Sequence, residues 1–301
     1  MDRPRTGLPA LTSTGQVPAG TTVDLHVHST ASDGRLAPAA VVGRAAAAGL
    51  GAVALTDHDT LAGVPEALAA GERLGIRVVA GCEFSAAAPW GEMHVLGYFL
   101  PSESPELEAF LARCRADRVR RGREMVTRLN TLGVALDFDD VLRHADGGAI
   151  GRPHVARAIV SRGGAAHVSE AFDRYIGRGR PAFVEKVLPQ FGEITAQVHA
   201  VRGLVSIAHL KDRGTRSFIE RLKFEGLDAV ETRHPSHDGE LRSRLTDIAL
   251  RLGLLRTGGS DWHGDPEPGA THGALGSQEV PLEWLERLEQ VRAARPAAAV
   301  G

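Results

Sequence analysis

Cysteine is scarce in this sequence, and so are aromatic side chains and any excess of charge. Two cysteines, Cys82 and Cys114, cannot form a disulfide framework, so we expect a reducing compartment, the cytoplasm. Aromatic residues make up 5% of the chain, so Ala, Val, Leu and Ile must supply most of the core. The net charge of −2 argues against a protein that binds long duplex nucleic acid through a general electrostatic field.

Long apolar runs are absent as well. No apolar stretch reaches the length of a membrane span, so we expect no membrane partner. Residues 1–20 are rich in Pro, Thr and Gly and lack the apolar segment of a signal peptide, which predicts a disordered tail. Residues 295–301 are expected to form a C-terminal tail.

Short apolar runs alternate with helix-like segments near both ends of the chain. This alternation predicts βαβ units and parallel strands. The expected strands are residues 23–28, 52–56, 77–82, 94–99, 204–208, 227–231 and 254–257. Residues 105–185 show helical patterns and almost no strand signal. The sequence therefore predicts an α/β barrel domain from residues 21–104 and 186–294, interrupted by a helical insertion domain, residues 105–185.

Histidine and carboxylate residues gather at the ends of the expected strands, where α/β barrels place their chemistry. Imidazole and carboxylate together suit Zn, Mn or Fe. The candidate ligands are His26, His28, Asp33, His58, Glu83, His94, His209, Asp261 and His263. Since one tetrahedral zinc takes about four protein ligands, this set predicts two or three divalent metal ions.

The local pattern around some of these ligands allows a second interpretation. His26 and His28 stand two apart on one strand, so both project from one face. His94 opens an apolar strand, and a core histidine is the competing interpretation. Asp59 is expected to cap the following helix while His58 binds metal. Three histidines without motif context are expected at the surface: His144, His167 and His272.

In combination, the motifs between residues 22 and 276 resemble the PHP (polymerase and histidinol phosphatase) family. The shared motifs are Asp24-Leu-His26-Val-His28-Ser29 with Ser32-Asp33-Gly34, Thr56-Asp57-His58-Asp59-Thr60, Gly81-Cys82-Glu83-Phe84-Ser85, Ala208-His209, and Gly259-Ser260-Asp261-Trp262-His263-Gly264. Within the family the chain is most similar to the stand-alone bacterial branch of nucleoside 3′,5′-bisphosphate phosphatases and the 5′-to-3′ exoribonuclease RNase AM. The branch markers are Gly151-Arg152-Pro153-His154-Val155-Ala156, Gly179-Arg180-Pro181-Ala182-Phe183-Val184, and His234-Pro235-Ser236-His237.

The resemblance implies a distorted (β/α)7 TIM-like barrel and a metal-dependent phosphoesterase. It implies that one metal is held by His26, His28, Glu83 and Asp261, a second with help from Glu83 and His94, and the rest by Asp33, His58, His209 and His263. A hydroxide that bridges the metals would remove the 3′-phosphate of nucleoside 3′,5′-bisphosphates such as pAp. It would also, or instead, cleave short 5′-phosphorylated RNA from its 5′ end. The expected partner is thus a small nucleotide or short single-stranded RNA, bound by a monomer.

Cationic residues are the candidate substrate ligands. Arg152 opens a helix, where an anion is favoured, although a solvated arginine at such a position is common. The resemblance, rather than the residue type, assigns substrate binding to Arg152, His154, Arg180, Lys211, Arg213 and His234. Arg152 would absorb developing charge, and His234 or a metal-bound water would protonate the leaving oxygen. The arginine-rich run from residue 113 to 128 is expected to be a solvated helix face, with an RNA track as the alternative.

Two departures from the family pattern leave every ligand in place. Leu210 stands where relatives usually carry proline, and Thr232-Arg233 stands where valine and tyrosine are common. Alternative functions are a histidinol-phosphate phosphatase and an amidohydrolase, the latter disfavoured because none of the three lysines is an obvious carbamate carrier. A non-catalytic metal-binding module is disfavoured because all nine candidate ligands are retained.

Overall fold

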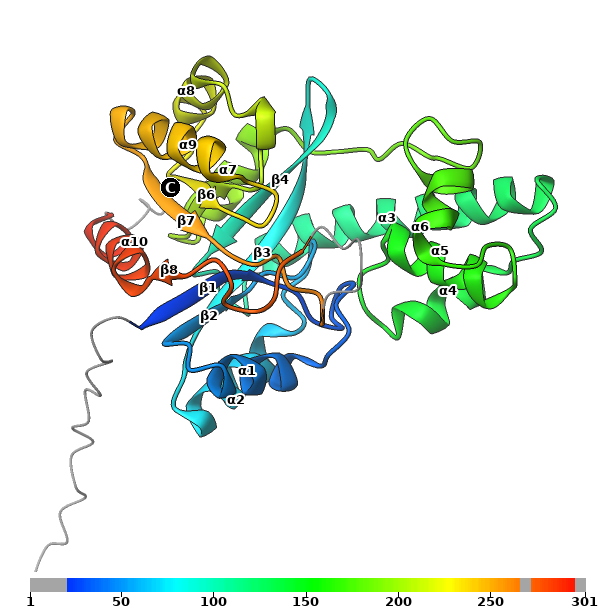
Figure 1. Ribbon diagram of the computed structural model, residues 1–301, viewed down its shortest axis with the longest axis horizontal. Helices are drawn as coiled ribbons and strands as arrows, with labels where there is room; N and C mark the ends of the chain where they lie inside the picture. The colour runs from blue at the N-terminus through cyan, green and yellow to red at the C-terminus, as the bar shows by residue number, and fades with distance from the viewer. Residues whose placement is uncertain (1–20, 266–271, 296–301) are drawn as a thin grey trace, which may run out of the picture.

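A computed structural model describes residues 21–265 and 272–295, and both predicted tails lie largely outside the described residues. In this part of the chain, eight strands form one sheet in the order β7-β6-β5-β4-β3-β2-β1-β8 (Figure 1). The strands are β1 (Thr22–Val27), β2 (Ala52–Leu55), β3 (Arg77–Ala88), β4 (Gly91–Tyr98), β5 (Leu204–Ile207), β6 (Ala229–Arg233), β7 (Leu255–Gly258) and β8 (Val280–Pro281).

The sheet curls into a nearly closed barrel, which confirms the predicted fold class. Just beyond β7, Trp262 forms a parallel bridge with Val27 at the end of β1. The backbone N–H of His28 donates to the carbonyl oxygen of Trp262 at 2.9 Å. Gly259 lies so close to β1 that a Cβ atom there would come within 2.4 Å of the His26 Cβ. The first strand and the last long strand are therefore neighbours.

The strands are not all parallel as predicted. Pairing is parallel for β1–β2–β3 and for β5–β6–β7, but β4 is antiparallel to both β3 and β5, and β8 is antiparallel to β1. The prediction was wrong at β4 because only Pro89 and Trp90 connect it to β3. A two-residue connection permits a hairpin, whereas a parallel crossover needs a dozen or more residues.

Of the described helices, six cover the outside of the barrel. They are α1 (Pro38–Ala47), α2 (Val64–Leu74), α7 (Phe191–Ala200), α8 (Arg216–Phe224), α9 (Gly239–Arg251) and α10 (Leu282–Ala294). Helix α2 ends at Gly75, whose φ of 68° is left-handed and carries no Cβ penalty. The buried side chains beneath these helices are mostly aliphatic, as the composition predicts.

The middle of the chain is helical and projects from one side of the barrel (Figure 1). It comprises α3 (Pro105–Thr131), α4 (Phe138–Ala145), α5 (Arg152–Ser161), α6 (Val168–Ala171) and a π-helical turn (Phe172–Ile176). These helices share an apolar cluster that includes Leu129, Val141 and Ile159. The exact domain boundaries stay a prediction. None of the described helices combines the length and the apolarity needed to cross a bilayer.

Candidate metal centre

All nine candidate ligands come to one place, at the end of the barrel where the parallel strands have their carboxyl termini and where the antiparallel β4 contributes His94 from its first half. Glu83 is at the centre of this group, and five imidazole nitrogens lie 2.7–3.2 Å from its two oxygens. The Oε2 atom of Glu83 lies 3.2 Å from His26 Nε2, 3.1 Å from His28 Nε2 and 3.2 Å from His58 Nδ1. Its Oε1 atom lies 2.7 Å from His94 Nδ1 and 3.0 Å from His209 Nε2. One carboxylate thus contacts five imidazoles from four other segments of the chain.

The remaining carboxylates complete the group. Asp261 Oδ1 lies 3.3 Å from both His26 Nε2 and His28 Nε2. Asp33 Oδ1 lies 3.2 Å from His263 Nε2. Several four- and three-residue subsets have ligand atoms that all lie within 4.8 Å of one another. The expected surface residue His272 belongs to one such subset, and its ring stacks on that of His263 with centroids 4.5 Å apart. The surface prediction was therefore wrong for His272, which lies beside His263.

Buried polar atoms in this cluster lack hydrogen-bond partners. Among the described residues these are His26 Nε2, His28 Nε2, Asp33 Oδ1, His58 Nδ1 and His94 Nδ1. Buried polar groups in native proteins are nearly always satisfied. Ligand atoms about 2.1 Å from a tetrahedral ion lie about 3.4 Å from one another. The observed separations of 3.1–3.3 Å and the lone pairs aimed at a common point therefore fit divalent metal ions.

Electrostatics in the cluster are consistent with a site built for cations. Burial lowers the pKa of His58 to about 3, although the Glu83 and Asp33 carboxylates favour its charged form. Burial also disfavours charge on His28, but the nearby carboxylates of Asp261 and Glu83 raise its pKa to about 10. Burial opposes ionisation of Glu83, yet the surrounding imidazoles hold its pKa well below the usual range. Without a cation, these histidines thus differ in protonation. A bound cation would favour the neutral form of every imidazole, which is the form that coordinates metal.

A second layer of carboxylates orients the ligands. Glu231 on β6 is buried, its Oε1 lies 2.9 Å from His26 Nδ1, and its Oε2 accepts from the His209 backbone N–H at 2.7 Å. Glu92 Oε1 lies 3.2 Å from His94 Nε2. His94 is thus turned toward Glu83 and is not a core histidine. Sequence reasoning missed Glu231, although this acid closes the predicted strand 227–231 much as Glu83 directly follows the predicted strand 77–82.

Asp57 holds the turn that carries Asp33. It accepts hydrogen bonds from the Ser29 backbone N–H at 2.8 Å, the Ser29 hydroxyl at 2.7 Å and the Ser32 hydroxyl at 2.6 Å. Three short bonds to one carboxylate fix the backbone between His28 and Asp33.

Asp59 does not cap helix α2, contrary to the sequence prediction. The helix begins only at Val64, and Asp59 instead accepts from the Ser85 backbone N–H at 3.0 Å and from Arg118 Nε at 2.7 Å. Both charged side chains are buried. The prediction of a solvated arginine face was therefore wrong for Arg118, and also for Arg121, because the helix lies against the end of the barrel.

Several expected substrate residues reach the cavity above the cluster. Arg152 and His234 line a cavity of about 400 Å³ together with the candidate ligands. Arg213 and Lys211 line an adjoining cavity of about 450 Å³, which also contains Arg152. His234 Nδ1 accepts from the Ser236 backbone N–H at 3.1 Å, so its ring proton is on Nε2, 3.4 Å from Asp261 Oδ2.

Two expected substrate residues are not brought to these cavities. His154 is buried, and its Nδ1 accepts from the Gly151 backbone N–H at 3.0 Å, which caps the start of α5. Arg180 is exposed and is not among the described residues that line either cavity. Arg178, on the same turn, lines the outer cavity and donates to the Trp90 carbonyl oxygen.

Comparison with known proteins gives consistent matches. A family profile described as PHP domain matches residues 24–245. A 5′-3′ exoribonuclease of Haemophilus influenzae is 34% identical over 245 residues, covering 80% of this chain and 89% of that protein. A 3′,5′-nucleoside bisphosphate phosphatase of Chromobacterium violaceum is 34% identical over 284 residues, covering 91% and 99%. The crystal structure of a protein from Bifidobacterium adolescentis, described as a metal-dependent phosphoesterase, matches with a TM-score of 0.83 and 32% identity, covering 92% and 98%.

Proposed function

The chain belongs to the PHP domain family and is a metal-dependent phosphoesterase, and from this premise we propose that it hydrolyses phosphate esters of nucleotides. The proposed substrates are the 3′-phosphate of nucleoside 3′,5′-bisphosphates such as pAp, and short RNA that carries a 5′-phosphate. The observation that carries the proposal is the cluster around Glu83, whose unpartnered ligand atoms lie beside a cavity lined by cations.

We propose three ion positions, taken by Mn, Fe or Zn. The sets are His26, His28, Glu83 and Asp261 for the first, Glu83, His94 and His209 for the second, and Asp33, His58 and His263 for the third. Support comes from the short ligand-to-ligand separations within each set. Ions held there would supply a Lewis acid and would activate water near neutral pH.

The protein's own residues would bind the phosphate and protonate the product. The Arg152 guanidinium has no carboxylate partner among the described residues and faces the cavity, so it can bind phosphate oxygens and stabilise developing charge. His234 offers an N–H at Nε2 to the leaving oxygen, and in its imidazolium form it can pass that proton on. Lys211 and Arg213, in the adjoining cavity, would bind the rest of the nucleotide.

A side-by-side assay tests this proposal. Purified enzyme loaded separately with Mn, Fe and Zn would be given pAp, a ladder of 5′-phosphorylated RNA, histidinol phosphate and a cyclic amide. We expect turnover of pAp, of RNA, or of both, and loss of that turnover in Asp33→Ala and His263→Ala variants. Turnover confined to histidinol phosphate or the amide would contradict the proposal.

A further inference from the structure

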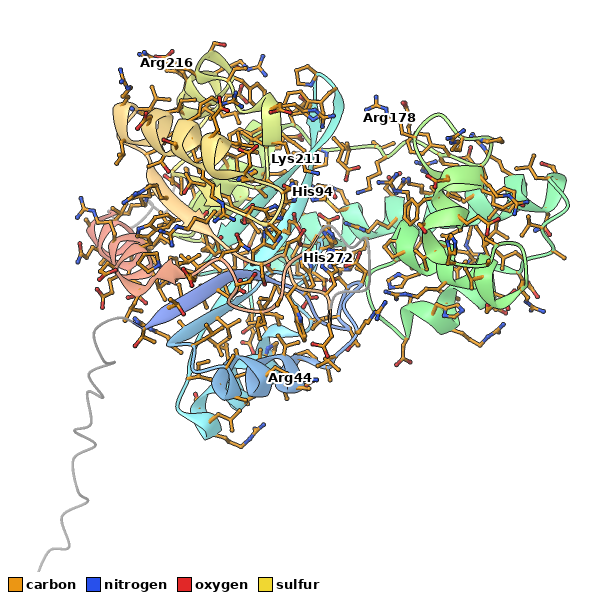
Figure 2. All side chains as sticks on the ribbon, viewed as in Figure 1. Arg44, His94, Arg178, Lys211, Arg216 and His272 are labelled. Atoms are coloured by element: carbon orange, nitrogen blue, oxygen red, sulfur yellow. The ribbon has the colours of Figure 1, made fainter. Side chains whose placement is uncertain are left out.

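A tenth candidate ligand, His272, lies at the rim of the metal centre. It is half-buried, lines the cavity above the cluster, and is found on the side of the barrel that faces the helical segment (Figure 2). His272, Asp261 and His263 each offer one ligand atom, and these three atoms lie within 4.8 Å of one another. The His272 ring stacks on that of His263, and neither of its nitrogens has a hydrogen-bond partner in the described part of the chain. Two imidazoles and one carboxylate are a common ligand set for a zinc ion that keeps an open position.

Backbone hydrogen bonds hold His272 at this rim. The next residue, Gly273, donates its N–H to the Ser260 carbonyl oxygen at 2.8 Å. The buried carboxylate of Asp24 accepts from the Ser260 backbone N–H at 2.9 Å and from the Gly276 backbone N–H at 2.8 Å. Three hydrogen bonds thus tie the segment that carries His272 to the loop after β7, which supplies the other two ligands of the rim.

The first proposed ion position is the most enclosed one, and Asp261 connects it to the rim. Of its four ligands, His26 and His28 are fully buried and do not line the cavity, whereas Glu83 and Asp261 do. The Oδ1 atom of Asp261 lies 3.3 Å from Nε2 of both histidines. Its Oδ2 atom points the other way, 3.4 Å from Nε2 of the cavity residue His234. One carboxylate can therefore bind an ion on the cavity side and release it on the inner side.

His263 limits the time that an ion can stay at the rim. Its Nδ1 lies 2.8 Å from the carbonyl oxygen of Asp261, which can only accept, so Nδ1 carries the proton and Nε2 holds the lone pair. The same Nε2 lies 3.2 Å from Asp33 Oδ1 in the third proposed set. Because one lone pair binds one ion, His263 cannot serve the rim and the third position together. The rim set thus suits an ion in transit and not a resident ion.

We propose that His272, together with Asp261 and His263, forms an outer metal position through which divalent ions enter the buried centre. This inference rests on the ion positions of the proposed function and adds how they are filled. His272 captures the ion, and Asp261 passes it inward by exchanging Oδ2 for Oδ1 as the bound oxygen. His263 then returns to the third set. Loss of His272 should therefore slow metal uptake and leave the final metal content unchanged.

The test measures metal uptake and not hydrolysis. Metal-free enzyme is mixed with Zn²⁺, uptake is followed by stopped flow with a chromophoric chelator, and the final zinc content is measured by metal analysis. His272→Phe keeps a ring against His263 but has no lone pair. We expect its uptake rate to fall on the order of 10- to 100-fold, because losing a ligand costs at least as much as losing the outer partner of one. The final zinc content should equal that of wild type.

Two further variants make the comparison specific. His272→Asp restores a ligand atom at the rim and should recover most of the uptake rate. His167→Ala removes an exposed histidine of the helical segment and should load as fast as wild type, which makes it the matched control.

Three results would overturn this inference alone. Equal uptake rates in wild type and His272→Phe would mean that ions enter by another route. A lower final zinc content in His272→Phe would make His272 a resident ligand. Slow uptake together with a lower Tm of the metal-free variant would make it a structural residue. Wild-type enzyme that takes up no zinc would instead overturn the proposed metal centre, and the inference with it.

Discussion

The Nδ1 atom of His26 lies 2.9 Å from Oε1 of Glu231, with both side chains buried. A carboxylate can only accept, so Nδ1 must carry the proton. The lone pair of Nε2 is then free to point between Glu83 and Asp261. The second oxygen of Glu231 holds the backbone of His209, whose φ of 24° is unfavourable for a residue with a side chain. One acid thus orients ligands from two different strands.

Replacing Glu231 with glutamine should weaken metal binding on the order of 10- to 100-fold, because the orientation and basicity of His26 would be lost. The measurement is competition with a chromophoric chelator, together with the metal content of purified protein. Glu240→Gln, at an exposed position on α9, is the control. Unaltered affinity in Glu231→Gln would mean that the acid has no role in ligand orientation.

Removing Arg118 should destabilise the fold strongly. Its partner Asp59 would remain as a buried carboxylate without a counter-ion, a change that costs about 3–5 kcal/mol in free energy of unfolding. Urea unfolding of Arg118→Met checks this, and Arg44→Met, which breaks an exposed pair with Asp265, should have little effect. Arg118 also donates to the Ile150 carbonyl oxygen at 3.2 Å, so the variant should displace Arg152 as well. A loss below about 1 kcal/mol would show that the buried pair contributes little.

Gly259→Ala should separate β7 from β1. The new Cβ would lie 2.4 Å from the His26 Cβ and 2.5 Å from its backbone nitrogen, so backbone must move. We expect a loss of about 1–3 kcal/mol in stability, with reduced metal content. Thermal unfolding and metal analysis test this. At Gly239, where an added Cβ meets open space in the first turn of α9, the same substitution should be neutral or slightly stabilising.

Substrate affinity should fall in alkaline solution because Lys186 loses its positive charge there. Burial, together with neighbouring Arg118, lowers the pKa of this amine to about 8, so it loses its proton as the pH rises through that value. The cavity then has one positive charge fewer, and KM for a nucleotide should rise above about pH 8. A pH profile should keep this inflection in Lys223→Met, whose side chain lies outside both cavities, and lose it in Lys186→Met. An inflection that persists in Lys186→Met would assign it to another group.

Most of the metal ligands could be predicted because they lie at or just after a short apolar run, and the ends of parallel strands meet at one edge; His94, inside the antiparallel strand β4, is the exception. Local patterns also located β2 to within one residue. The extension of β3 to Ala88 could not be predicted, since a run of alanines has little strand propensity and is held by distant contacts, the pairing with β4 and a hydrogen bond from the Ala87 backbone N–H to the Pro189 carbonyl oxygen. The partners of Asp59 could not be predicted either, because Arg118 is distant in sequence and comes from a helix that is otherwise largely polar.

The bridge between Val27 and Trp262 has a consequence for biosynthesis. Ligands up to His94 precede the helical segment in the chain, whereas Asp261 and His263 follow β7. During synthesis, the set His26, His28, Glu83 and Asp261 therefore cannot be complete until the residues after β7 have been made.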